Sequence, residues 1–316
     1  MKAFGLADED SSAAMLDVPT PEAGPGEVLV RVRASSVNGW DVFVMSGHAR
    51  GMMEHRYPVI GGKDYAGVIE SLGEGVTTFA VGDEVAGIVP TEPILSIGSY
   101  AECVAVPGDG FIDRKPANLD FEQAASVGLA ALTASVCVDL LEPSKGDVVL
   151  VVGATGGVGT YSIQLVSDRG ATVVASALAE DGEWIRGFGA SEVVDYSGDV
   201  VAAVREQHPD GIDGLIVAVQ LGDGFNPLAE LVKDGGKIAS TVGGADVEAL
   251  AERGVSATNV VGQSDPEAFA GAIRMAAAGT ITAPITRTFT FDELPEALGL
   301  TGKQRSRGKF AVTISS

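Results

Sequence analysis

Cysteine is scarce in this chain, which has only Cys103 and Cys137 among 316 residues. Two cysteines cannot form the multi-bridge framework of a small secreted domain, and these two lack the spacing of zinc ligands. The three histidines, His48, His55 and His208, also show no ligand spacing. We therefore expect a protein of the reducing cytoplasm.

Positive charge is the second deficit. The sequence has 21 Lys and Arg against 43 Asp and Glu, which gives a formal net charge of −22 at pH 7. Nucleic acids and anionic membranes repel such a chain, so neither is expected as a partner. The acidic residues are scattered, which leaves open either an adaptation to a salt-rich cytoplasm, where repulsion is screened, or an ordinary acidic surface.

Long apolar runs are also missing. Runs such as "VVLVVGA" look too short to cross a bilayer, so no membrane span is expected. The N-terminal "MKAFGLADED" turns acidic at once, unlike a signal or transit peptide.

The pattern that is present predicts an α/β protein in two parts. Residues 1–121 read as short strands broken by Gly and Pro turns. Apolar spacing predicts a helix over 122–142, and from Asp147 strands and helices alternate as in a doubly wound parallel sheet. The helices of this second part are expected near 181–188, 199–207, 226–233 and 266–278, with a last strand at 255–261. The tail from 283 to 316 returns to strand-like alternation and is expected to complete the first part, leaving 122–282 as the second domain.

The loop "VVGATGGVG" (151–159) is the most informative local motif. Gly156 and Gly159 occupy the second and third glycine positions of a dinucleotide-binding fingerprint, with Ala154 in the first. A strand precedes the loop and a helix follows it. Gly156, Gly157 and Val158 are therefore expected to present backbone N–H groups to a pyrophosphate at the positive end of the helix dipole.

The residue about 20 positions after the loop glycines decides which dinucleotide fits, because NAD sites place an Asp or Glu there. Here the count reaches Ser176, a small neutral residue that leaves room for a 2′-phosphate. This favours NADP(H). The indication is incomplete, since Glu180 and Asp181 lie close by and no basic residue follows before Arg186.

Several segments, in order, resemble the zinc-free quinone oxidoreductase branch of the medium-chain dehydrogenase/reductase superfamily. They include "GGKDYAGVIESLGEGVTTFAVGDEVAG" (61–87), "GSYAECVAVP" (98–107), "VGLAALTAS" (127–135) and "RGKFAV" (307–312). The resemblance spans nearly the whole chain. It implies a GroES-like β-rich catalytic domain, a Rossmann domain that binds NADP(H), and a homodimer formed through the edge strand near "SATNVVG".

The resemblance also implies a site without metal. Zinc-dependent members place ligands at positions that correspond here to Asn38, to Lys63 within "GKD", and to the segment 127–135. An amide, a protonated ammonium and a segment without ligands are not a zinc donor set. Two interpretations of Lys63 stay open: it points away or pairs with Asp64 or another carboxylate, or its ammonium stabilises an oxyanion of the reduced substrate.

Further candidate residues follow from the same resemblance. Thr133 and the stretch Val242, Gly243 and Gly244 match positions near the nicotinamide, and Tyr196 could meet the adenosine phosphate. Tyr57 lies in a loop expected to carry substrate specificity. The candidate catalytic residues are thus Tyr57, Lys63 and Asn38. Asn38 is expected to donate a hydrogen bond to the substrate or to the nicotinamide ribose.

Without a Lewis acid to polarise an alcohol, the expected reaction is NADPH-dependent hydride transfer to a quinone or an α,β-unsaturated carbonyl compound. The first alternative is an enoyl-thioester reductase of lipid or polyketide metabolism. That alternative is weakened because His48 and Ala49 stand where such enzymes tend to carry a proton-donating Tyr. A NADPH-binding protein with little catalysis is the second alternative, and a zinc alcohol dehydrogenase is the most distant.

Overall fold

The computed structural model describes residues 1–90, 94–260, 265–303 and 306–315. The chain divides into two compact units. The first comprises residues 1–129, 265–278 and 283–316, and the second comprises 130–264 and 279–282. Residues 261–262 of the expected edge strand lie outside the described residues.

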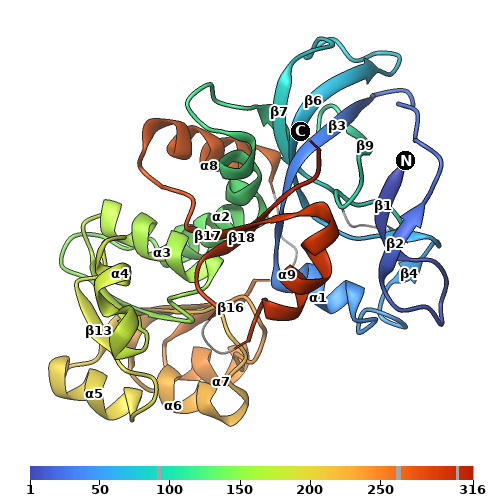
Figure 1. The fold of residues 1–316 in the computed structure, drawn as a ribbon. Helices are drawn as coiled ribbons and strands as arrows, with labels where there is room; N and C mark the ends of the chain where they lie inside the picture. The colour runs from blue at the N-terminus through green and yellow to red at the C-terminus, as the bar shows by residue number, and fades with distance from the viewer. Residues whose placement is uncertain (91–93, 261–264, 304–305, 316) are drawn as a thin grey trace. The chain divides into compact units, whose positions relative to one another are not determined.

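The first unit is built mainly of strands (Figure 1). Its principal sheet has the order β10-β7-β6-β3-β18-β17, with β9 also pairing with β3. Smaller sheets are formed by β2-β1-β5 and by β4-β8. The strands are β1 (Lys2–Leu6), β2 (Ala14–Asp17), β3 (Glu27–Val37), β4 (Glu54–His55), β5 (Val59–Ile60), β6 (Asp64–Leu72), β7 (Glu84–Ile88), β8 (Ile94–Leu95), β9 (Cys103–Pro107), β10 (Ile112–Arg114), β17 (Ile285–Thr290) and β18 (Lys309–Thr313).

Segments distant in the sequence meet in this sheet. The red C-terminal strand β18 lies beside the blue strand β3 in Figure 1, with Ala311 opposite Ser36. Helices α1 (Gly39–Met45), α8 (Pro266–Ala278) and α9 (Leu294–Leu300) accompany the strands. The interior is apolar and includes the fully buried Val30, Val32, Tyr65 and Tyr100.

The second unit is a six-stranded parallel sheet in the order β13-β12-β11-β14-β15-β16. Its elements are β11 (Val148–Val152), α3 (Gly157–Asp168), β12 (Thr172–Ser176), α4 (Gly182–Arg186), β13 (Glu192–Val194), α5 (Val200–Gln207), β14 (Ile212–Val217), α6 (Phe225–Ala229), β15 (Val232–Ser240), α7 (Val247–Glu252) and β16 (Ser256–Asn259). The central strand β11 is almost wholly buried, as expected for a strand covered on both faces.

Three expectations differ from the observed elements. The helix expected over 226–233 ends at Ala229, and β15 already begins at Val232. The helix 266–278, expected to complete the parallel sheet's domain, groups with the first unit because α8 packs against β10. The expected domain boundary at 121/122 falls at the start of a long helix, α2 (Phe121–Leu141), whereas the compact units divide at 129/130.

By length and composition alone, helix α2 could cross a membrane, and its mean hydropathy is 1.8. The sequence analysis, which expected only short apolar runs, overlooked this property of the helix. Its most apolar window is 72% buried inside the structure, as in a core helix. The helix is also interrupted, because Gly128 has non-helical dihedral angles (φ 0°, ψ −127°). This kink releases the N–H of Leu129, which donates to the Asp64 carboxylate at 2.7 Å.

Replacing Gly128 with alanine is expected to destabilise the protein by about 2 kcal/mol or more. A Cβ atom at this position would overlap the Asp64 carboxylate, and the backbone angles do not suit a residue with a side chain. Urea unfolding measures the loss. The control is Gly299→Ala in α9, where a Cβ meets nothing within 4 Å and the change should stay within about 1 kcal/mol. Equal midpoints for the two variants would contradict the role of Gly128.

Candidate functional site

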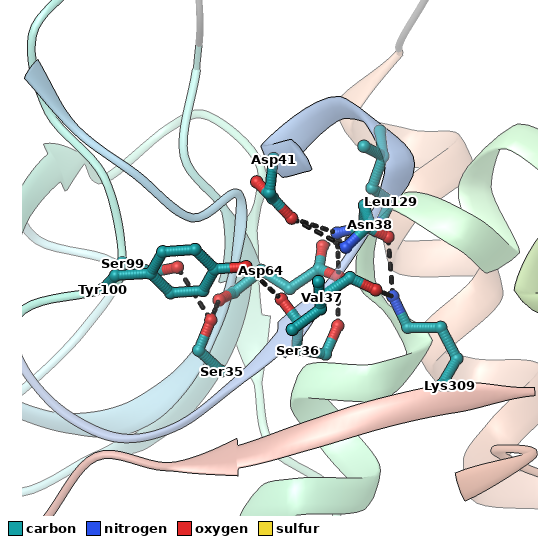
Figure 2. Close-up of polar contacts among 10 residues, drawn as sticks. All are labelled: Ser35, Ser36, Val37, Asn38, Asp41, Asp64, Ser99, Tyr100, Leu129 and Lys309. Atoms are coloured by element: carbon teal, nitrogen blue, oxygen red, sulfur yellow. Dashed lines mark hydrogen bonds and ion pairs between the residues drawn. The ribbon is translucent and has the colours of Figure 1, made fainter. Parts of the chain in front are cut away.

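A buried polar network lies where β3, β6 and β18 approach one another in the first unit (Figure 2). Asp64, the first residue of β6, has no exposed surface. Its Oδ2 accepts hydrogen bonds from Ser36 Oγ at 2.5 Å and Asn38 Nδ2 at 2.8 Å. It also forms an ion pair with Lys309 Nζ at 3.3 Å. Together with the Leu129 N–H on Oδ1, these partners compensate the buried charge.

Asn38 precedes α1 and is held from three sides. Its Nδ2 group donates to Asp41 Oδ2 at 3.1 Å and to Asp64 Oδ2, and its Oδ1 accepts from Lys309 Nζ at 2.6 Å. The Asp41 carboxylate also accepts the backbone N–H of Asn38 at 2.8 Å, so the two residues form a capping box at the start of α1. Both N–H groups of the amide are thus used, and the donor role expected for Asn38 would require one of these bonds to be given up.

Lys63 is buried, with a relative exposure of 8%. Its ammonium donates to the carbonyl oxygen of Val89. Burial lowers the pKa of Lys63 to about 8, and the negative charges of Asp41 and Asp64 oppose this shift. The direct ion pair of Asp64 is formed by Lys309, a residue that the sequence analysis did not consider.

Close packing explains the glycine directly before Lys63. Gly62 has φ +91°, and a Cβ there would lie 2.6 Å from the Tyr100 ring and 2.5 Å from Ser99 Oγ. The buried Tyr100 thus leaves room only for glycine where the chain turns into β6.

These groups do not fit a zinc ion. Lys63 binds a carbonyl through an N–H, and the Asn38 amide spends its nitrogen on carboxylates and its oxygen on Lys309. Neither offers the lone pairs that zinc takes from thiolate or imidazole. Among the residues that the structure describes, no group of three or more His, Cys, Asp and Glu side chains could hold a metal.

Tyr57, the third candidate catalytic residue, lies between β4 and β5. Its ring stacks on His55 with the centroids 5.8 Å apart. The side chain is half-buried. The contacts described for Tyr57 do not join it to Asn38 or Lys63, so its catalytic role stays a prediction.

The cofactor residues lie in the second unit, where β11 ends. Gly153 takes φ +81° directly after the strand, so the tight turn is made by Gly153, and the assignment of Ala154 to the first glycine position missed it. Gly159 packs against this turn, since a Cβ there would overlap the Gly153 carbonyl. At Gly156 a Cβ would meet only the Gly153 oxygen at 3.4 Å, which leaves the front of the loop open.

Helix α3 begins at Gly157 and has no side-chain cap and no acidic residue in its first turn. The N–H groups of Gly157 and Val158 are therefore suited to an anionic pyrophosphate. Both the open loop and this helix start fit the dinucleotide that the sequence motif predicts.

The register of the parallel strands gathers most other cofactor candidates at one edge of the sheet. Ser176, the last residue of β12, lies beside Val152, the last residue of β11, and is buried. Val242, Gly243 and Gly244 follow the end of β15 at the same edge, and the Gln220 side chain donates to the Val242 carbonyl at 3.2 Å. Tyr196 is exposed just beyond β13, and Thr133 is half-buried in the part of α2 that belongs to this unit.

Replacing Lys309 with methionine is expected to lower the free energy of unfolding by about 3–5 kcal/mol, because it leaves the Asp64 charge buried without its cation. The side chains of this pair are 3% and 0% exposed. Lys233→Met is the matched control, since its pair with Asp213 is 36% and 32% exposed and is worth about 1 kcal/mol or less. Denaturant titration of both variants measures their free energies of unfolding. Equal decreases in the two variants would contradict the role of Lys309 in compensating the buried Asp64 charge.

Comparison with known proteins extends these observations. Residues 24–116 match the model of the alcohol dehydrogenase GroES-like domain, and residues 188–312 match the model of a zinc-binding dehydrogenase. Among solved structures, an NAD-dependent alcohol dehydrogenase superposes with a TM-score of 0.88 at 28% identity and covers 100% of both chains. The quinone oxidoreductase of Coxiella burnetii has a TM-score of 0.87 at 26% identity and covers 100% of this chain and 99% of its own.

Three curated relatives resemble the chain at a similar level. The putative quinone oxidoreductase YhfP of Bacillus subtilis is 30% identical over 97% of this chain and 96% of its own length. Quinone oxidoreductase of Sus scrofa is 34% identical over 70% of this chain, and the NADPH-dependent alkenal/one oxidoreductase of Arabidopsis thaliana is 32% identical over 72%. The chain spans less than two thirds of those last two proteins, 66% and 58%. With the two-unit fold, these matches show that the chain belongs to the medium-chain dehydrogenase/reductase superfamily, in its quinone oxidoreductase branch.

Proposed function

We propose that this protein is an NADPH-dependent reductase that transfers a hydride to a quinone or an α,β-unsaturated carbonyl compound without a metal ion. The observation that carries the proposal is the donor set of the first unit. Asn38 and Lys63, which the resemblance places at zinc-ligand positions of the zinc-dependent members, donate hydrogen bonds to Asp64 and to the Val89 carbonyl. The names of the Bacillus, Sus and Arabidopsis relatives support the same acceptors.

The chemistry divides between the cofactor and the chain. Bound NADPH supplies the hydride. The start of α3 binds its pyrophosphate, and Ser176 leaves space for the 2′-phosphate. The Lys63 ammonium stabilises the negative charge that develops on the acceptor oxygen, gives that oxygen a proton, and is reprotonated from solvent. The acceptor thus gains one hydride and one proton.

The preference for NADPH rests on the residues around Ser176. The Asp195 carboxylate, in the loop after β13, accepts the N–H groups of Ala179 at 3.1 Å and Ser197 at 2.8 Å. The Ser197 side chain, and then these N–H groups, hold the pKa of Asp195 below its usual value, so this exposed carboxylate stays charged and bound to its own loop. A small neutral residue at position 176 then leaves the edge of the sheet open to a phosphate.

Purified protein is expected to oxidise NADPH faster than NADH with 1,4-benzoquinone and with a simple enone, and a chelator should not change either rate.

The variant Ser176→Asp should lower the NADPH:NADH ratio of kcat/KM about tenfold or more, because a carboxylate repels the 2′-phosphate and accepts hydrogen bonds from ribose hydroxyls. Absorbance at the nicotinamide band follows turnover. Absence of turnover with both acceptors would reject the function, and reduction of crotonyl thioesters alone would select the enoyl-thioester reductase.

We also propose a cytoplasmic homodimer without membrane or nucleic-acid partners. Among the residues that the structure describes, β16 is the last strand in the order of the parallel sheet and pairs only with β15, so its other edge is suited to a second copy. Light scattering is expected to give twice the chain mass of 32.2 kDa. Placing a proline at Ala257, within β16, should yield monomers because it removes a ladder donor. A wild-type mass of 32.2 kDa would contradict the dimer.

A further inference from the structure

The loop of residues 241–246, which joins β15 to α7, is held by side chains from the ends of two neighbouring strands. Ser240, the last residue of β15, has no exposed surface, and its Oγ donates to the Gly243 carbonyl at 2.6 Å. Asn259, the last residue of β16, lies beside Ser240 in the parallel register. Its Oδ1 accepts the Ala245 N–H at 3.2 Å, and its Nδ2 donates to the Ala245 carbonyl at 3.0 Å. The Asn259 amide thus binds both backbone groups of one loop residue.

The backbone of this loop does little to fix its own shape. Gly243 and Gly244 take left-handed φ angles of +75° and +93° in succession, and glycine loses the most conformational freedom when it is ordered. Within the part of the chain that the structure describes, residues 242–245 form no backbone–backbone hydrogen bond. The shape of the loop therefore depends on the side chains that bind it.

The position of the loop in the sheet indicates what it would contact. The chain passes from β11 to β12 and β13 on one side of β11, and then crosses to β14, β15 and β16 on the other side. In open parallel sheets, ligands bind outside the carboxyl ends of the strands where the strand order reverses in this way.

A dinucleotide bound there would lie across both sides of β11. With its pyrophosphate at the start of α3, its adenosine half lies toward β12, where the position of Ser176 is the one that reads the adenosine ribose. Its other half then extends toward β14 and β15. The loops that follow these two strands are joined by the hydrogen bond from Gln220 to the Val242 carbonyl.

We propose that Asn259 is a positioning residue for the nicotinamide half of the cofactor: through its two bonds to Ala245 it fixes the loop 241–246, against which the nicotinamide is held during hydride transfer. The inference rests on the proposed function, because it requires NADP(H) to bind at this edge of the parallel sheet. Asn259 acts through the backbone of Ala245. Its effect on turnover follows from geometry, since a displacement of about 1 Å at the reacting atoms can lower a rate about 100-fold.

The variant Asn259→Ala removes both bonds to Ala245, and its effect should be confined to one half of the cofactor. The affinity for NADPH is expected to fall about tenfold, because binding must then order a loop that has lost two hydrogen bonds. The kcat with 1,4-benzoquinone should fall about tenfold or more. The affinity for 2′,5′-ADP, which has the adenosine and the 2′-phosphate but no nicotinamide, should stay within about twofold. Isothermal titration calorimetry measures both affinities.

Gln164→Ala is the matched control in the same unit. The Gln164 amide binds Thr282 by the same two kinds of bond, accepting its N–H at 2.7 Å and donating to its carbonyl at 3.1 Å. Gln164 lies in the second half of α3, beyond the first turn that faces the pyrophosphate. Loss of these bonds lowers stability, but the ratio of the NADPH and 2′,5′-ADP affinities should stay within about twofold of the wild-type ratio.

A second variant tests the same loop from its other attachment. Ser240→Ala removes the bond to the Gly243 carbonyl and should also weaken NADPH binding selectively. If Asn259→Ala does not fold, Asn259→Asp takes its place, because it keeps the oxygen that accepts the Ala245 N–H and loses the donor to the Ala245 carbonyl.

The two ligands separate this inference from the proposed function. A loss of affinity for NADPH without a loss for 2′,5′-ADP supports the role of Asn259. Equal weakening of both ligands, or no weakening of either, overturns that role while wild-type turnover still supports the function. Wild-type protein that binds neither ligand rejects the NADPH-dependent function, and the inference with it. For a wild type that binds NADH instead, NADH and 5′-ADP serve in the same comparison.

Discussion

The Asp64 carboxylate is the constraint on which the first unit depends. It has no exposed surface, so its charge costs several kcal/mol unless it is compensated by donors inside the protein. The donors come from the end of β3, from the kink of α2 and from the start of β18. Because one carboxylate joins all three, the strand order, the kink and the C-terminal strand are parts of one arrangement.

The ammonium groups of Lys63 and Lys309 need different neighbouring groups from those that a metal ion needs. Zinc takes lone pairs from its ligands, whereas an ammonium gives hydrogen bonds to acceptors. The carbonyl of Val89, the amide oxygen of Asn38 and the Asp64 carboxylate are all acceptors, and each faces Lys63 or Lys309. The chain thus provides the surroundings of ammonium groups.

The sequence predicted those structural features that depend on residues close together in the chain. Alternating strands and helices revealed the parallel sheet, and the glycine run located the loop at the end of β11, because both patterns lie within a few residues of the structure that they produce. The turn glycine Gly153 was missed because the fingerprint was read from Ala154 onward, although Gly153 is the first residue after the apolar strand and takes a left-handed φ.

Contacts distant along the chain could not be predicted in the same way. Lys309 lies 245 positions from Asp64, and its sequence context, "RGKFAV", reads simply as a strand. The kink at Gly128 exists because Asp64 approaches that point of α2, so a helical pattern alone predicts a continuous helix. The pairing of Asp41 with Asn38 is a local capping box, but its burial beside a second carboxylate follows only from the meeting of α1 with β6.

The unequal treatment of the two carboxylates gives the network two kinds of member. Asp64 uses both oxygens on donors from three segments and has an ammonium beside it. Asp41 receives the Asn38 donors on one oxygen, and burial, followed by the charge of Asp64, raises its pKa to about 6. The network therefore combines a carboxylate that joins three segments with a second carboxylate whose charge changes close to neutral pH.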